Sequence, residues 1–136
     1  MQVFADTLYW VASITPGDTW HGPTLAAVAA LGSMELVTTE EVLVEFLSAY
    51  AGRGEYLRRE ALKTVRAILT NAHVTVRPQT HQSFMSGLDF YAARADKAYS
   101  LVDCISMQTM RQMSFTDVLT NDHHFTQEGF NVLVKP

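Results

Sequence analysis

The sequence predicts an α/β protein in which helices cover both faces of a parallel sheet. Short apolar runs alternate with helical segments along the whole chain, and the segments between the runs are long enough for the crossovers that parallel strands require. The chain has 136 residues, of which 48% are hydrophobic, so it can bury one sizeable core. No repeat, linker or low-complexity segment divides it. We therefore expect a single domain over residues 1–136.

The predicted strands are short and mostly apolar, which is typical of strands buried on both faces of a parallel sheet. Pro78 stops the third of them, because proline has no backbone N–H to donate to a neighbouring strand. In chain order the strands are Val3–Ala5, Glu35–Val37, Val74–Val76, Val118–Thr120 and Asn131–Val134.

Helical segments are predicted between these strands. Pro16 and Gly17 separate the first two helices, and Gly52 and Gly54 separate the next two, since both residue types interrupt helices. In chain order the helices are Thr7–Ser13, Asp18–Leu31, Glu40–Ala51, Glu55–Asn71, Thr80–Arg94 and Ser100–Met113.

The charge balance limits the kinds of partner. The net charge is −4 and the isoelectric point is about 5.6, whereas proteins that bind nucleic acid through their overall field are usually basic. A nucleic-acid role would therefore need a local basic patch or a bound cation. The single cysteine, Cys104, excludes an internal disulfide. With no visible signal peptide and no apolar run of the ~20 residues that a membrane span needs, we expect a cytoplasmic protein without a membrane contact.

Two aspartates follow predicted strands. Asp6 comes directly after Val3–Ala5, and Asp122 follows Val118–Thr120 with one residue, Asn121, between them. In parallel sheets, ligands collect at the carboxyl ends of the strands, where the strand order reverses. Aspartate also favours turns and helix N-caps, so each residue alone has an ordinary structural explanation. Because two predicted strands are each followed by an aspartate, a functional site is favoured over two unrelated turns.

Glu45 and Asp103 extend this set of acids. Thr38 and Glu41 have the spacing of a capping box, which gives Glu41 a structural role, whereas Glu45 has none and lies at the edge of an apolar stripe. Asp103 has the same capping-box spacing with Ser100. The helix that contains Asp103 is apolar on nearly every side, so we expect this carboxylate to be partly buried and to need a partner.

Four acids in one cleft would repel each other. A pair of like charges ~4 Å apart costs about 4 kcal/mol at an intermediate effective dielectric constant. A divalent cation would neutralise such a cluster, and ligation by oxygen alone suits Mg²⁺ or Mn²⁺ rather than zinc. Mg²⁺ keeps several waters and bridges to phosphates. The pattern therefore indicates phosphodiester hydrolysis, in which the ion activates water and stabilises the charge on phosphorus.

Four segments of the chain also match a known arrangement in order and spacing. They are FADT at residues 4–7, TTEEVLVEFL at 38–47, DKAYSLVDCISM at 96–107 and LTNDHHFTQEGF at 119–130. Together they resemble the PIN-domain family, and most of all the VapC-type toxin ribonucleases of prokaryotic toxin–antitoxin pairs. Each segment is weakly specific alone, but the resemblance extends over essentially the whole chain.

The resemblance implies a three-layer α/β/α sandwich with a short, doubly wound parallel sheet, and a metal-dependent endoribonuclease that uses Mg²⁺ or Mn²⁺. It also implies a homodimer, an RNA substrate and a cognate antitoxin protein. The acidic quartet of the family falls on Asp6, Glu45, Asp103 and Asp122, and its hydroxyl positions fall on Thr7 and Thr120.

The two histidines after Asp122 raise the question of a nitrogen ligand. His123 and His124 are adjacent, and adjacent residues of a helix point about 100° apart, so we do not expect them to share one ion. They also lack the i, i+4 spacing of helical zinc sites. We expect one histidine near the rim of the cleft and Phe125 in the core.

A basic cluster falls on one face of the fourth predicted helix. Arg59, Lys63 and Arg66 have the spacing of one helix face. They are candidates for contact with RNA phosphates or with an acidic partner. The alternative is a solvated helix face without a ligand.

Two other functions are compatible with the same residues. One is a non-catalytic PIN-like module that binds RNA or a protein. The other is a phosphotransfer protein in which Asp6 is the nucleophile, although such proteins need a lysine at a later strand end and none occurs here. The sequence does not specify the RNA target, the antitoxin or the number of ions.

Overall fold

The computed structural model describes residues 1–136 as a five-stranded sheet in which every neighbouring pair of strands is parallel. The strand order is β3-β2-β1-β4-β5. The chain therefore adds β2 and β3 on one side of β1, and then adds β4 and β5 on the other side. The strands are β1 (Gln2–Ala5), β2 (Glu35–Thr39), β3 (Val74–Arg77), β4 (Asp117–Leu119) and β5 (Asn131–Val132). This topology confirms the predicted doubly wound α/β fold.

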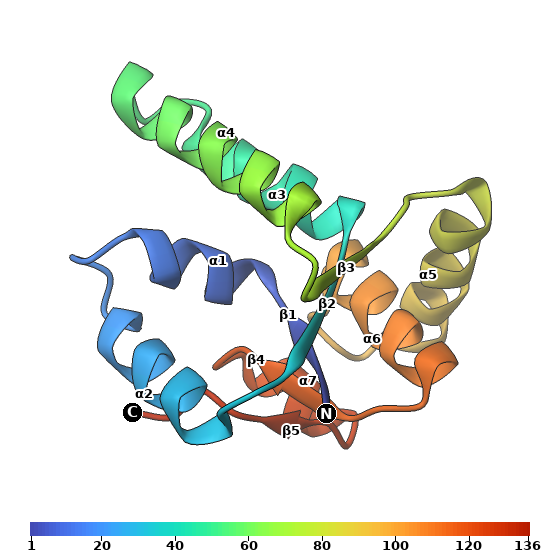
Figure 1. The fold of residues 1–136 in the computed structure, drawn as a ribbon. Helices are drawn as coiled ribbons and strands as arrows, with labels where there is room; N and C mark the ends of the chain where they lie inside the picture. The colour runs from blue at the N-terminus through green and yellow to red at the C-terminus, as the bar shows by residue number, and fades with distance from the viewer.

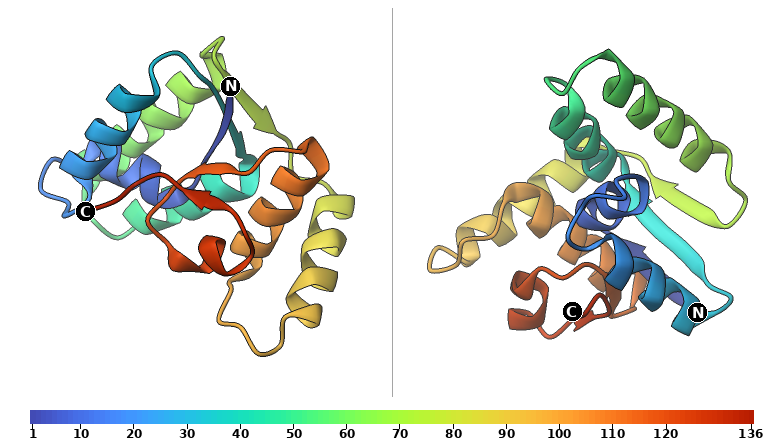
Figure 2. Two further views of the ribbon diagram at one scale, coloured as in Figure 1. Left: turned by 90° about the horizontal axis from the view of Figure 1, so that it is seen from below. Right: turned by 90° about the vertical axis from the view of Figure 1, so that its left-hand side faces the viewer.

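Helices cover both faces of the sheet. Figures 1 and 2 show α1 and α2 on one side of the sheet and α5 and α6 on the other, while α3 and α4 form an antiparallel pair that extends away from it. The helices are α1 (Thr7–Ile14), α2 (His21–Leu31), α3 (Glu40–Tyr50), α4 (Glu55–Thr70), α5 (His81–Ala93), α6 (Leu101–Met113) and α7 (His123–Gln127). No helix is both long enough and apolar enough to cross a membrane.

The alternation of side chains along β1 divides the core into two parts. Val3 packs in a small cluster with Leu119 and with partly buried side chains of α2. Its neighbour Phe4 belongs to the main core, which includes Met107 and Met110 of α6. Successive residues of a strand point to opposite faces, so one short strand anchors both helical layers.

The register of β1 and β4 determines where the two strands end. Phe4 lies opposite Val118, and Ala5 lies opposite Leu119. Both strands therefore end at the same level, and the residues that follow them, Asp6 and Thr120, meet at one edge of the sheet.

The predicted elements are present within two residues of their expected ends, except for the start of α2 and for one additional helix. Helix α2 begins at His21 rather than at Asp18, because Asp18 instead accepts a hydrogen bond from the backbone N–H of Trp20 at 2.8 Å and closes a turn. The short helix α7 was not predicted. The last strand covers only Asn131–Val132.

One of the two predicted capping boxes is wrong. The residue that caps α3 is Thr39, whose side chain accepts from the N–H of Val42 at 3.1 Å. Thr38 is buried within β2 and donates its hydroxyl to the carbonyl of Ala5 at 2.9 Å. Glu41 instead accepts from the Ser83 hydroxyl at 2.7 Å, so its structural role is to hold α5 beside α3.

The close packing of α5 on α6 generates a prediction about stability. A methyl group at Gly87 would lie 2.4 Å from Cγ1 of Ile105, which is far inside van der Waals contact. The helix-propensity gain of alanine is about 1 kcal/mol, whereas overpacking a core costs about 1–3 kcal/mol. We expect Gly87→Ala to lower the free energy of unfolding, measured by urea denaturation.

Gly22 in α2 is the matched control, because an added methyl group there meets nothing within 4 Å. We expect Gly22→Ala to be neutral or slightly stabilising. Equal stabilisation by both substitutions would contradict this prediction, because it would mean that the Ile105 side chain moves aside without loss of folding free energy.

Candidate active site

A cleft lies at the carboxyl edge of the sheet, beyond the ends of β1 and β4. Its volume is about 430 Å³. All four predicted acids line it, and they reach it from the ends of two strands, from α3 and from the start of α6. The lining residues are Asp6, Thr7, Leu8, Val11, Asp18, Trp20, Glu45, Ser100, Asp103 and Asp122.

Thr120 joins the ends of the two central strands. It is fully buried, and its hydroxyl donates to the Asp6 carboxylate at 3.1 Å. The same oxygen accepts from the backbone N–H of Asp122 at 3.2 Å. One side chain thus orients Asp6 and the backbone of Asp122 at the same time, and it lies at one of the two hydroxyl positions that the resemblance implied.

Glu45 reaches the cleft from α3. The hydroxyl of Thr7, the first residue of α1, donates to the Glu45 carboxylate. This contact links the helix that follows β1 to the helix that follows β2. The expected position of Glu45 at a cleft is confirmed, and Thr7 holds its carboxylate there.

Asp103 has a structural and a cleft-facing role together. Its carboxylate accepts from the N–H of Ser100, and its own N–H donates to the Ser100 hydroxyl, both at 3.0 Å. This is the predicted capping box at the start of α6. Because the box fixes the carboxylate in the first turn, it also holds Asp103 against the cleft.

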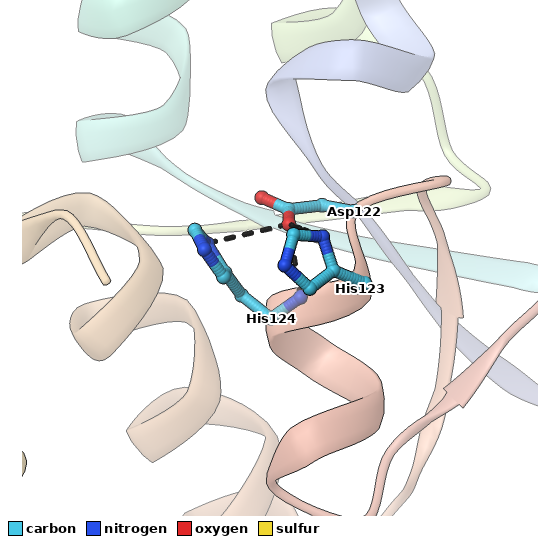
Figure 3. Close-up of side chains that lie close together, drawn as sticks. All are labelled: Asp122, His123 and His124. Atoms are coloured by element: carbon cyan, nitrogen blue, oxygen red, sulfur yellow. Dashed lines mark hydrogen bonds and ion pairs between the residues drawn. The ribbon is translucent and has the colours of Figure 1, made fainter. Parts of the chain in front are cut away.

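Asp122 and the two histidines lie close together at the start of α7 (Figure 3). Asp122 caps this helix, because its carboxylate accepts from the N–H of His124 at 2.9 Å. The ring of His124 lies near Asp103 and Asp122 and is 19% exposed, whereas the ring of His123 is 76% exposed. Phe125 is fully buried, as predicted.

The proximity of both imidazoles to one carboxylate was not expected. One ligand atom from each of Asp122, His123 and His124 lies within 4.8 Å of the others, and the two ring centroids are 4.6 Å apart. The Nδ1 atom of His124 lies 3.3 Å from Asp122 Oδ1 and 3.5 Å from Asp103 Oδ2. The spacing argument predicted one histidine near the rim, but it did not predict a ring nitrogen between two acids.

The electrostatics of the cleft disfavour ionised acids. Burial raises the pKa of Asp6 to about 7, with a further contribution from the negative charge of Asp103. Burial also raises the pKa of Asp103, and the charge of Asp122 adds to this effect. No lysine or arginine lines the cleft to offset these charges.

This set of donors fits a hard divalent cation. The cleft offers carboxylate oxygens from Asp6, Asp103 and Asp122, with Glu45 nearby, and Asp6 is only 5% exposed. Buried carboxylates without a protein cation are stabilised by a bound ion that neutralises them. The cleft therefore has the ligand chemistry of a Mg²⁺ or Mn²⁺ site.

The predicted basic face lies outside this cleft. Arg59, Lys63 and Arg66 are exposed on α4. Arg59 pairs with Glu55 at 2.6 Å and Lys63 pairs with Glu60 at 3.5 Å, both within the same helix. Of the three, only Arg66 has no ion pair.

Two cleft residues were missed by reasoning from the sequence. Asp18 and Trp20 come from the loop between α1 and α2 and line the cleft beside α1. The sequence predicts that a helix starts at Asp18, because this residue follows Pro16-Gly17. The turn that places it in the cleft depends on its own hydrogen bond to Trp20, which leaves no distinct signal in the sequence.

The fold is a doubly wound α/β fold that brings four carboxylates together at the carboxyl edge of its sheet. A scan of protein-family models and a search of curated proteins gave no match. Among solved structures, the chain is similar to VapC20 of Mycobacterium tuberculosis, described as a toxin that cleaves the sarcin-ricin loop. The TM-score is 0.85 at 26% sequence identity, over 98% of this chain and 99% of that one. This similarity confirms the predicted resemblance to the VapC-type PIN-domain family.

The raised pKa of Asp6 predicts an unusual pH dependence of stability in metal-free protein. An unfolded aspartate has a pKa near 3.8, whereas the folded value is about 7. Between these values the folded state binds a proton that the unfolded state does not. Stability from this group therefore falls as the pH rises from about 4 to about 7, then levels off. We expect urea denaturation in EDTA to show about 3 kcal/mol more stability at pH 5 than at pH 8 from this group.

Asp6→Asn is the control, because asparagine keeps an acceptor for the Thr120 hydroxyl but carries no charge. We expect this variant to be more stable than the natural protein at pH 8 and to lose most of the pH dependence. Identical pH profiles for the two proteins would contradict the assignment to Asp6.

Proposed function

We propose that the protein is a metal-dependent endoribonuclease and the toxin of a type II toxin–antitoxin pair. The observation that carries this proposal is the convergence of Asp6, Glu45, Asp103 and Asp122 on one cleft that contains no lysine or arginine. The structural similarity to a toxin that cleaves the sarcin-ricin loop supports RNA as the substrate. We further propose that it acts in the cytoplasm, with a cognate antitoxin and as a homodimer, in line with the family resemblance.

We propose that three of the acids hold the ion. Asp6, Asp103 and Asp122 would provide its carboxylate ligands, with Glu45 contributing directly or through water. When bound, a divalent ion supplies charge stabilisation for the phosphate and lowers the pKa of water, so that hydrolysis can proceed at neutral pH.

Two threonine side chains orient these acids. Thr120 holds Asp6 and the backbone of Asp122, and Thr7 holds Glu45. Fixed carboxylates keep the attacking water and the scissile phosphate in a reactive arrangement, and such positioning contributes a large part of a hydrolase's rate. We propose that Glu45, which is partly exposed in the cleft, accepts a proton from the water.

A non-catalytic PIN-like module that binds RNA or protein remains the second candidate. It retains the fold and the cleft but has no metal-dependent activity. Binding of Mn²⁺ to metal-free protein separates the two, because only the nuclease requires the ion.

Cleavage of structured RNA by purified, partner-free protein tests the proposed function. We expect cleavage in Mn²⁺ or Mg²⁺ and none in EDTA. Asp6→Asn and Asp103→Asn should each lower the cleavage rate by about 100-fold or more, the scale on which loss of one preorganised electrostatic contact acts. Full activity in either variant would contradict the assignment.

Asp96→Asn is the matched control for these variants. Asp96 is 75% exposed, lies outside the cleft, and forms an ion pair with its neighbour Lys97 at 3.5 Å. We expect its cleavage rate to match that of the natural protein. If the folded natural protein binds no Mn²⁺ and cleaves no RNA from a panel that includes a sarcin-ricin loop hairpin, the binding-module alternative holds.

The basic face of α4 is proposed to contact RNA phosphates. We expect Arg59→Gln, Lys63→Gln and Arg66→Gln together to weaken RNA binding and to reduce its salt dependence, because each phosphate contact contributes a slope of about −0.7 in a log–log plot for single strands. Filter binding in an Asp103→Asn background measures this without cleavage, with Lys135→Gln as a control. Unchanged affinity and slope would leave this face as a solvated helix surface.

A further inference from the structure

The imidazole of His124 provides a nitrogen atom at the edge of the acidic cleft. Its Nδ1 lies 3.3 Å from Asp122 Oδ1 and 3.5 Å from Asp103 Oδ2. This nitrogen is buried, yet it makes no hydrogen bond within the protein. A buried polar atom without a partner costs about 1–3 kcal/mol. Such an atom beside two carboxylates indicates a partner that binds in the cleft.

The surroundings of the ring keep this nitrogen in place. The backbone N–H of His124 is bound to Asp122, which fixes the start of α7. The ring of Tyr99 meets the imidazole edge to face, with centroids 5.3 Å apart. The Tyr99 hydroxyl donates to Glu128 at 2.9 Å, and this carboxylate is also bound by Arg94 and Arg111.

The carboxylate that binds Tyr99, that of Glu128, is buried and bound by two arginines. The Glu128 side chain is 7% exposed, and the hydrogen bond from Arg94 is the main reason why its pKa falls to about 2. Glu128 therefore stays ionised and keeps Tyr99 in position against the ring. A metal ligand needs this kind of support, because a ring that is already oriented loses little entropy when it binds an ion.

We propose that His124 Nδ1 is a ligand of the ion that Asp103 and Asp122 hold, and that the site consequently prefers Mn²⁺ to Mg²⁺. This inference rests on the metal site of the proposed function and adds to it a nitrogen donor and a class of ion. Imidazole is a good ligand for first-row transition ions, whereas Mg²⁺ binds oxygen ligands and water almost alone.

The adjacent His123 does not share these features. Its ring is largely exposed, and its Nδ1 lies 3.9 Å from Asp122 Oδ1. It is therefore a matched control, with the same residue type one position away in the same helix turn.

A competing explanation is that His124 is only a cationic partner for two acids. The two explanations predict opposite effects when the ring nitrogen is removed. Loss of a ligand weakens Mn²⁺ binding, whereas loss of a competing positive charge strengthens the binding of any cation. The sign of the change therefore separates them.

The test uses the full-length protein, freed of metal with EDTA, and two probes, Mn²⁺ and Mg²⁺. Calorimetry gives both affinities for the natural protein, for His124→Phe and for His123→Phe. Phenylalanine keeps the ring that packs on Tyr99 and removes the nitrogen. We expect His124→Phe to lower the ratio of Mn²⁺ to Mg²⁺ affinity by about tenfold or more, and His123→Phe to leave it within about twofold.

Pulsed electron paramagnetic resonance of bound Mn²⁺ provides a second readout, which needs no activity and works on the natural protein even if His124→Phe fails to fold. We expect a nitrogen coupling in the natural protein and in His123→Phe. Mn²⁺ binding without nitrogen coupling, an unchanged affinity ratio or tighter binding in His124→Phe would each overturn the inference and leave the proposed function intact. Failure of the natural protein to bind either ion would overturn both.

Discussion

The parallel pairing of β1 with β4 is the constraint on which the cleft depends. These strands come from opposite ends of the chain, and the opposition of Ala5 and Leu119 makes them end at the same level. Only then can the Thr120 hydroxyl bind both the Asp6 carboxylate and the N–H of Asp122. A shift of one residue in this register would turn every side chain of the strand to the other face and separate the two acids. The rest of the site, from α3 and α6, is arranged around this junction.

Three of the four acids are also placed at the starts of helices. Asp6 occupies the N-cap position of α1, Asp122 caps α7, and Asp103 completes the capping box of α6. The positive end of a helix dipole favours a carboxylate at each of these positions by a few tenths to about 1 kcal/mol. This benefit offsets only part of the repulsion in the cleft, since the pKa of Asp6 still rises to about 7. The arrangement of acids in the cleft therefore lowers the stability of the folded protein.

Hydrogen bonds of Glu128, at the end of α7, connect the region of His124 to α5 and α6. Glu128 holds Arg94 at the end of α5, Arg111 of α6 and Tyr99 of the intervening loop. Arg94 and Arg111 also lie over the ring of Phe90, and Tyr99 contacts the ring of His124. The position of His124 thus depends on both helices of the α5–α6 layer, although α7 itself has only five residues.

The sequence by itself determined the fold class and indicated the four acids that line the cleft, because apolar strand patterns and a carboxylate after a strand depend on neighbouring residues. It also indicated the capping box of Asp103, since that box is local. The tertiary structure alone decided where Asp18, Trp20 and His124 lie, because their positions depend on turns and on contacts with distant segments. It also decided that Thr39 rather than Thr38 caps α3, because β2 continues two residues further than its apolar run. Local patterns specify elements, whereas the packing of distant elements specifies which side chains share a cleft.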